Sequence, residues 1–228
     1  MNKHMLECDS EILTPAKSGL YVAAVCDILD DLGYRNQTMH QRLRPLLPNP
    51  TACGFIGRAR TICWTKTDGV IGEDPYGLEI EAMDCLRPGD VVVHSTDYSG
   101  TITPWGALVT TVARKRGAVG CVCDAGIRDC VNIIEMEFPV YYSSIQPLDS
   151  KGRGIVTAFD VPIQCGEVPV RTGELIFADF DGIVVVPTEA EQKVFKLALE
   201  KVEKERFMRR ELSEGKSLRE TYARYGTL

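Results

Sequence analysis

The sequence predicts an α/β domain with a helical extension at its C-terminal end. Segments with apolar residues at three- and four-residue spacing, typical of amphipathic helices, alternate with short apolar runs bounded by turn residues, typical of buried strands. After Pro187 the chain becomes charged and keeps an apolar stripe at helical spacing. A length of 228 residues accommodates one domain with such an extension. We therefore expect one domain over residues 1–187 and a helical extension over residues 188–228.

The first half of the chain predicts helices and strands in alternation. Val22, Val25 and Leu29 recur at helical spacing over residues 21–32, and Gly33 follows as a C-terminal stop. Five further elements are expected: a strand over 54–64, a helix over 80–86, a strand over 91–94, a helix over 105–116 that ends at Gly117, and a strand over 118–123.

The second half of the chain is mostly sheet before its helical end. The turn Asp179-Phe180-Asp181-Gly182 lies between two apolar runs, 175–178 and 183–186, and predicts a hairpin. The other expected elements are a short helix over 131–136, a strand over 138–143, a pair of strands within 154–170, a helix over 189–212 and one or two helical turns over 217–225.

Composition narrows the classes of partner. A net charge of −6 without basic runs argues against nucleic acid and against an anionic membrane surface. The nine cysteines are an odd number without framework spacing, which favours a reduced, cytoplasmic protein. Residues 1–11 do not have the pattern of a signal peptide, and no stretch of about 18 apolar residues predicts a membrane span. Small molecules and proteins remain as partners.

Two segments combine glycine with polar groups where chemistry is expected. In Pro104-Trp105-Gly106-Ala107-Leu108, glycine allows a close approach of the backbone, and the following helix offers free amide groups to a carboxylate. An ordinary helix N-terminus explains the same pattern. In Asp124-Ala125-Gly126-Ile127-Arg128-Asp129, which follows a predicted buried strand, arginine supplies a fork for a carboxylate and aspartate an oxygen ligand for a hard cation. The alternative is a turn with a solvated ion pair.

Other polar residues give weaker signals. The aspartates of the 178–182 segment either bind a metal or shape the hairpin, and the second reading is favoured. His4, His40 and His94 lack metal-ligand spacing, which argues against a zinc site and against a serine–histidine pair.

Seven segments, read in order, resemble the family named for the regulator of ribonuclease E activity, RraA. They are VCDILDDLG, GRARTI, RPGDVVV, PWGALVTTVARKRGAVGCVCDAGIRD, EMEFPVY, TGELIFADFDGIVVVP and GKSLRETYARYGTL. The enzymatic branch of this family contains 4-hydroxy-4-methyl-2-oxoglutarate aldolases and oxaloacetate decarboxylases. Each segment alone is a weak signal, but seven in the same order, spread over most of the chain, are specific.

The resemblance implies a β/β/α swivelling-type domain that assembles as a trimer or a pair of trimers, with active sites between subunits. It also implies Mg²⁺ or Mn²⁺ and a small 2-oxo acid substrate. By the match of segments, Asp129 holds the metal, partly through water, and Arg128 binds the keto oxygen and carboxylate. The backbone of Gly106, Ala107 and Leu108 binds the carboxylate. The C-terminal extension packs on the same or a neighbouring subunit, and its Glu205 reaches a metal-bound water molecule of the neighbouring subunit.

The expected reaction breaks a carbon–carbon bond and leaves pyruvate enolate, whose oxygen needs a cation. Retro-aldol cleavage of 4-hydroxy-4-methyl-2-oxoglutarate or 4-carboxy-4-hydroxy-2-oxoadipate and decarboxylation of oxaloacetate all fit. One departure is Ala107, where many members of the family carry an acidic residue. Two alternatives stay open: a non-catalytic protein-binding regulator of a ribonuclease, and an enzyme that uses the same site on another 2-oxo or hydroxy acid. For Glu205 the alternative is a solvated helix face, paired with Arg209.

Overall fold

The structure is a computed structural model, and it describes residues 19–70, 72–97 and 99–227. Its main sheet has the order β1-β5-β4-β3-β2-β9-β10, with β6 paired to the free part of β2, and a small hairpin pairs β7 with β8. The strands are β1 (Arg44–Pro45), β2 (Phe55–Lys66), β3 (Asp90–Ser95), β4 (Gly120–Ile127), β5 (Val140–Ile145), β6 (Gly154–Phe159), β7 (Ile163–Cys165), β8 (Val168–Val170), β9 (Leu175–Asp179) and β10 (Gly182–Val186).

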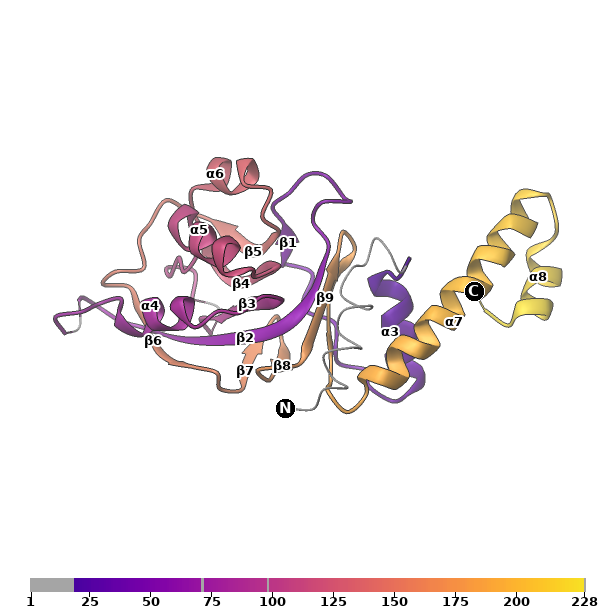
Figure 1. Ribbon diagram of the computed structural model, residues 1–228, viewed down its shortest axis with the longest axis horizontal. Helices are drawn as coiled ribbons and strands as arrows, with labels where there is room; N and C mark the ends of the chain where they lie inside the picture. Colours follow the sequence, from indigo (N-terminus) through magenta and orange to yellow (C-terminus); the bar gives the residue numbers. More distant parts are fainter. Residues whose placement is uncertain (1–18, 71, 98, 228) are drawn as a thin grey trace.

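Parallel pairing runs from β2 through β3 and β4 to β5. Each of these strands is joined to the next by a helix, as parallel neighbours require. The strand β2 is long enough to pair in addition with β9 at its start and with β6 at its end, both antiparallel. Figure 1 shows β2 curving along the whole domain. The two central parallel strands, β3 and β4, are buried on both faces along their whole length.

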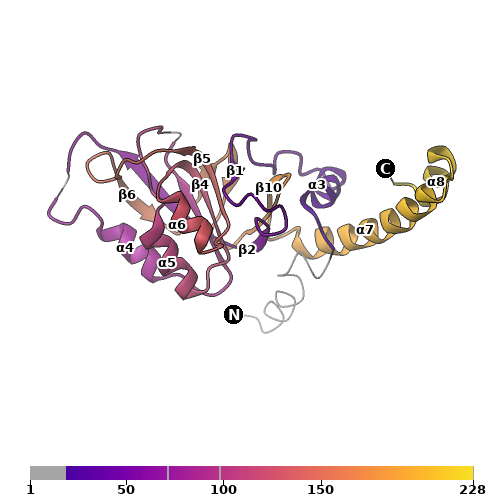
Figure 2. The same cartoon turned by 90° about the horizontal axis from the view of Figure 1, so that it is seen from above.

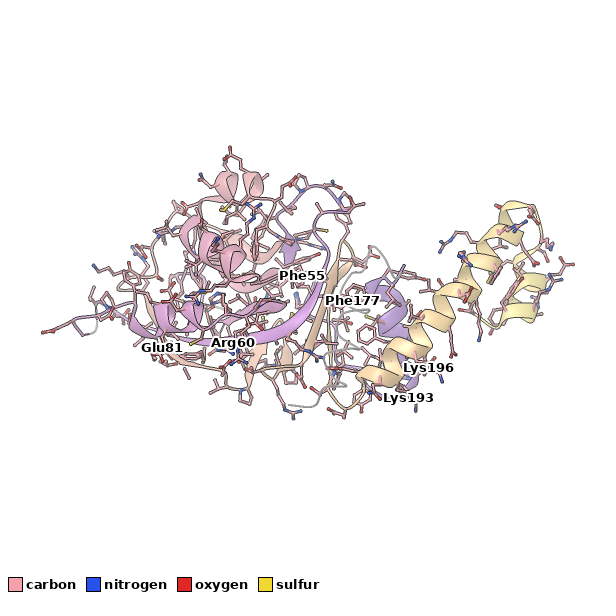
Figure 3. All side chains as sticks on the ribbon, in the orientation of Figure 1. Phe55, Arg60, Glu81, Phe177, Lys193 and Lys196 are labelled. Atoms are coloured by element: carbon pink, nitrogen blue, oxygen red, sulfur yellow. The ribbon has the colours of Figure 1, made fainter. Side chains whose placement is uncertain are left out.

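Helices cover the sheet on different sides. Figure 2 shows α4, α5 and α6 grouped on one side of the strands, while α3 and α7 lie beside β9 and β10. Phe177 of β9 belongs to the apolar cluster under α3 (Figure 3). The helices are α3 (Val22–Asp31), α4 (Gly77–Asp84), α5 (Ala107–Arg116), α6 (Cys130–Glu135), α7 (Glu191–Ser213) and α8 (Leu218–Tyr225).

The C-terminal helices form an arm. Helix α7 starts beside α3 and extends away from the sheet, and α8 folds back along it (Figure 1). Helix α8 begins at a capping box in which Ser217 and Glu220 each accept the backbone N–H of the other. None of the helices in the described part of the chain is long and apolar enough to span a membrane. The domain boundary near residue 187 stays a prediction, and residues 1–18 of that domain lie outside the described residues.

The predicted elements are present, with three differences. Helix α4 begins at Gly77 rather than at residue 80, and the 154–170 region forms three strands rather than two. The strand before Arg128 does not end at residue 123: β4 continues to Ile127. Its pairing with β5 shifts register and resumes at Gly126 and Ile127, so the first four residues of the DAGIRD segment belong to the strand. A Cβ atom on Gly126 would lie 2.3 Å from Nε2 of Gln146, so any side chain at this position would displace Gln146.

Candidate functional site

A pocket of about 560 Å³ lies between α4, the start of α5 and the end of β4. One part of its wall is apolar, and another carries four carboxylates and one guanidinium. The lining residues are Tyr76, Glu79, Ile80, Met83, Asp84, Thr103, Pro104, Trp105, Gly106, Leu108, Val109, Val112, Arg128, Asp129, Asp149 and Ser150. Both segments that the sequence singled out as sites of chemistry therefore contribute to one pocket.

Backbone contacts hold these two segments together. Trp105 forms a parallel bridge with Ile127, and its carbonyl oxygen accepts the N–H of Arg128 at 2.9 Å. The N–H of Ala107 donates to Oδ2 of Asp129 at 3.1 Å. A Cβ atom on Gly106 would lie 2.8 Å from the same oxygen, closer than real Cβ atoms come. Glycine at 106 therefore makes room for the Asp129 carboxylate, as the glycine in this segment predicted.

Asp129 occupies a special backbone position. Its φ of 57° lies in the left-handed region, which aspartate tolerates better than most residues, and it directly precedes the first residue of α6. Its side chain is 44% exposed, with the N–H of Ala107 as its bonded partner and Nε of Arg128 4.0 Å away. The carboxylate is thus fixed at the pocket and still reachable by a ligand.

Arg128 lies between two carboxylates. Its Nη1 is 3.5 Å from Oδ2 of Asp149, and its Nε is 4.0 Å from Oδ2 of Asp129. The hydroxyl of Tyr76 donates to the same oxygen of Asp149 at 3.2 Å, and the N–H of Lys151 donates to the other at 3.1 Å. Burial acts to raise the pKa of Asp149, but the Lys151 bond, the Arg128 charge and the Tyr76 hydroxyl hold it below its ordinary value. Asp149 is therefore an anion that orients Arg128.

Glu79 has the opposite environment. It is half-buried in the first turn of α4, and burial together with the nearby charge of Asp149 raises its pKa to about 7, against the lowering effect of Arg128. The pocket therefore holds carboxyl groups of different protonation near neutral pH. Tyr76, Glu79 and Asp149 were not among the predicted site residues, because no spacing in the sequence connects them with Arg128.

The start of α5 is where the sequence predicted a carboxylate site, and the N–H of Ala107 there is already bonded to Asp129. Thr110 is the first residue of this helix whose N–H bonds to a carbonyl of the same turn, that of Gly106. Helix geometry leaves the amides before it without partners inside the helix. The side chain of Leu108 is 83% exposed at this end of the pocket. Leu108 is thus exposed at the predicted carboxylate site, whereas Gly106 is buried and the N–H of Ala107 already donates to Asp129.

Asp124 has a structural position, although it belongs to the same segment as Asp129. Its carboxylate is buried, accepts two bonds from Arg42 at 2.9 and 3.0 Å, and accepts the N–H of Gly166 at 2.9 Å. Arg42 also pairs with Glu167. The DAGIRD segment thus divides into a buried half that holds the fold together and an accessible half at the pocket.

The hairpin aspartates shape the turn, which is the interpretation that the sequence favoured over metal binding. Asp179 accepts the N–H of Asp181 at 2.9 Å and the N–H of Val22 at 2.7 Å. These bonds fix the turn and connect it to the start of α3.

Glu205 is not brought to the pocket within its own chain. It lies in α7, where it accepts the hydroxyl of Tyr21 and lies 3.4 Å from Nζ of Lys201. Lys201 also pairs with Asp27 of α3, so this network ties the arm to the domain. The expected reach of Glu205 into a neighbouring subunit stays a prediction.

The donor atoms of the pocket fit a hard cation that keeps much of its water. The described residues contain no group of three or more histidine, cysteine, aspartate or glutamate side chains that could enclose a metal. Mg²⁺ is commonly held by only one or two carboxylates, with waters and substrate oxygens completing its shell. Asp129, with one oxygen bonded to Ala107 and a half-exposed carboxylate, suits this mode.

Comparison with known proteins shows consistent likenesses. A family model described as RraA-like, Aldolase/RraA, matches residues 22–185. A protein of Halalkalibacterium halodurans with the provisional name 4-hydroxy-4-methyl-2-oxoglutarate aldolase is 30% identical over 197 residues, 86% of each chain. Among solved structures, Streptomyces coelicolor RraAS2, described as an unusual member of the RNase ES inhibitor RraA family, is 27% identical with a TM-score of 0.72, covering 84% of this chain and 92% of its own. A chain described among novel cellulases from gut-associated microbes has a TM-score of 0.75 at 27% identity, covering 85% and 83%.

Proposed function

The chain belongs to the RraA-like family, and from this premise we propose that it is a divalent-metal-dependent carbon–carbon lyase of small 2-oxo acids. The predicted β/β/α fold class with C-terminal helices is confirmed by the relatives. Relatives named as aldolases support lyase activity in the family. The observation that carries the proposal is the meeting of Arg128, Asp129 and the start of α5 in one pocket.

In this proposal the substrate carboxylate lies at the first amides of α5, and the keto oxygen lies beside Arg128. In oxaloacetate the C3–C4 bond breaks with release of CO₂, and in 4-hydroxy-4-methyl-2-oxoglutarate it breaks as the C4 hydroxyl loses its proton to water and becomes a carbonyl. In both substrates the electron pair of the bond moves into the 2-oxo acid and leaves negative charge on the keto oxygen. The guanidinium stabilises that charge through charge-assisted hydrogen bonds, and Asp149 holds it in place. Bound at Asp129, Mg²⁺ or Mn²⁺ would supply further positive charge for the same oxygen. Lysine is absent from the described pocket wall, so a Schiff-base route has no amine there.

The test is release of pyruvate from oxaloacetate or 4-hydroxy-4-methyl-2-oxoglutarate with Mg²⁺ or Mn²⁺, followed with lactate dehydrogenase. Arg128→Ala should lower the rate about 100-fold or more, the usual loss when an oxyanion donor is removed. Arg171→Ala is the matched control, because this arginine is 70% exposed and outside the pocket. The proposal is refuted if the wild-type protein releases no pyruvate, or if Arg128→Ala releases pyruvate at the wild-type rate. A chelator should abolish activity, and added Mg²⁺ or Mn²⁺ should restore it.

The proposal includes an assembly of three or six chains with the pockets between subunits, in which Glu205 of one chain reaches the metal water of the next. Glu205→Gln should then lower pyruvate release and leave the oligomer, read by light scattering, unchanged. If activity is unchanged while melting falls, Glu205 serves only the network with Tyr21 and Lys201.

A second candidate is a non-catalytic regulator of a ribonuclease. The likeness to RraAS2 favours it, together with Ala107, where the family resemblance implies an acidic residue. Its test is inhibition of an RNase E-type ribonuclease by the purified protein. If inhibition is equal in wild type and Arg128→Ala and no pyruvate is released, the regulatory reading replaces the lyase.

A further inference from the structure

Helix α4 presents two acidic residues in different ways. Glu79 and Met83 are four residues apart, lie on one face of the helix, and both line the pocket. Ala82 beside them is buried, so this face is directed at the domain. Glu81, labelled on α4 in Figure 3, is exposed and does not line the pocket. Glu79 is therefore held at the pocket by the orientation of the helix.

The other titratable groups of the pocket are committed elsewhere. Asp149 forms an ion pair with Arg128 and accepts a hydrogen bond from the Tyr76 hydroxyl, so the hydroxyl proton of Tyr76 is already engaged. Asp129 accepts the Ala107 N–H. Asp84 is 58% exposed and pairs with Arg116 at 2.6 Å.

Glu79 alone has no such commitment. Within the described residues it has no hydrogen-bond or ion-pair partner, and its burial favours the neutral, proton-carrying form near pH 7. A carboxyl group of this kind can give a proton to a substrate without first breaking an existing bond.

We propose that Glu79 is a catalytic residue of this pocket, whose carboxyl group gives the enolate carbon the proton that converts pyruvate enolate to pyruvate. This inference rests on the proposed lyase function. The O–H bond of Glu79 breaks and a C–H bond forms at C3. The electron pair for the new bond comes from the enolate, whose C2 carbonyl is restored. Glu79 is left as a carboxylate and regains its proton from water, so the step needs no further reactant.

The reverse of this step can be observed alone. In D₂O the Glu79 carboxylate should remove a methyl proton of pyruvate and return deuterium, and proton NMR then follows the loss of the methyl signal. Three variants complete the design: Glu79→Gln, which cannot transfer the proton; Glu79→Asp, which keeps a carboxyl group; and Glu81→Gln, the same change on the exposed face of the same helix. Binding of oxalate is read separately, as the rise in melting temperature it causes.

Glu79→Gln should lose exchange about 100-fold, at the lower end of the usual contribution of a general acid or base. It should bind oxalate as wild type does, and its steady-state consumption of oxaloacetate should fall as well, because protonation of the enolate completes each turnover. Glu79→Asp should recover part of the exchange, and Glu81→Gln should match wild type. Wild-type exchange should rise with pH through about 7, and Glu79→Gln should lack that rise.

The outcomes separate this inference from the function beneath it. If wild type cleaves oxaloacetate and exchanges pyruvate, and Glu79→Gln still exchanges within about twofold, Glu79 is not the donor and the lyase proposal stands. If Glu79→Gln loses oxalate binding together with exchange, its role is in binding, and the assignment as proton donor is overturned. If wild type neither cleaves nor exchanges, the lyase proposal fails and the Glu79 assignment fails with it.

Discussion

The two aspartates of the DAGIRD segment should respond to substitution in opposite ways. Asp124 is buried against Arg42 and the N–H of Gly166, whereas the Asp129 side chain is 44% exposed at the pocket. We predict that Asp124→Ala lowers stability and leaves the chemistry of folded molecules intact. Asp129→Ala should lower stability less than Asp124→Ala does and abolish pyruvate release.

The magnitudes follow from what each change leaves behind. Breaking a buried ion pair costs about 3–5 kcal/mol. We expect about 3 kcal/mol for Asp124→Ala, because the Arg42 side chain is 26% exposed and keeps its pair with Glu167. For a chain of this size that corresponds to a melting temperature about 6–12 °C lower. Asp129→Ala removes one backbone bond and a weak, exposed ion pair, and it places alanine at the left-handed φ of 57°; together these cost about 2 kcal/mol, less than the loss expected for Asp124→Ala.

Thermal unfolding followed by circular dichroism measures the first effect. Pyruvate release below the melting temperature of both variants, expressed per folded molecule, measures the second. Equal losses of stability in the two variants, or a larger loss for Asp129→Ala, would refute the division of the segment into a structural and a functional half.

Three other groups give predictions of their own. Burial lowers the pKa of His94 from 6.5 to about 3, so the unfolded chain binds a proton that the folded chain excludes. The free energy of unfolding should therefore fall by up to about 5 kcal/mol as pH drops from 6.5 to 3. In urea titrations His94→Gln should remove this pH dependence, and an unchanged dependence contradicts the assignment to His94. Glu79 should make stability depend on pH in the opposite direction, because its pKa is raised from 4.5 to about 7 and the folded state binds the extra proton. The free energy of unfolding should fall by up to about 3 kcal/mol as pH rises from 4.5 to 7, and Glu79→Gln should not show this fall. Gly106→Ala should displace the Asp129 carboxylate and lower pyruvate release about tenfold or more; wild-type rates would show that the carboxylate position does not matter.

Local patterns were sufficient to predict most helices and strands, because periodicity and turn residues act within a few residues. The order of strands depends on contacts between distant segments, such as the pairing of Arg58 with both Asp90 and Leu175, and the sequence gives no periodicity for them. The predicted strand over 118–123 ends too early for the same reason, since β4 continues to Ile127. Asp124 reads as a loop residue, but inside the fold Arg42, 82 positions away, neutralises it and lets the strand continue.

The candidate site was predicted in part. Ordered motifs pointed to Arg128, Asp129 and the Gly106–Leu108 backbone, and the structure places all of these at one pocket. Tyr76 and Asp149 could not be found in this way. Asp149 pairs with Arg128 from 21 positions further along the chain, and Tyr76 bonds Asp149 from 52 positions before Arg128; neither residue carries a motif of its own.

Arg128 shows why the pocket needs both kinds of carboxyl group. A guanidinium that stabilises an oxyanion must stay charged and correctly oriented, which an ionised Asp149 ensures. A proton donor must be neutral when the enolate forms, which an ionised group beside Arg128 cannot be. The charges of Asp149 and Arg128 both act on Glu79. At Glu79, however, burial outweighs the attraction of Arg128, and the carboxyl group keeps its proton. Pairs of carboxyl groups whose surroundings drive their pKa values apart are a recurrent basis for dividing acid and electrostatic roles. In this pocket that division depends on α4, which the recognised motifs at Arg128 and Asp129 do not include.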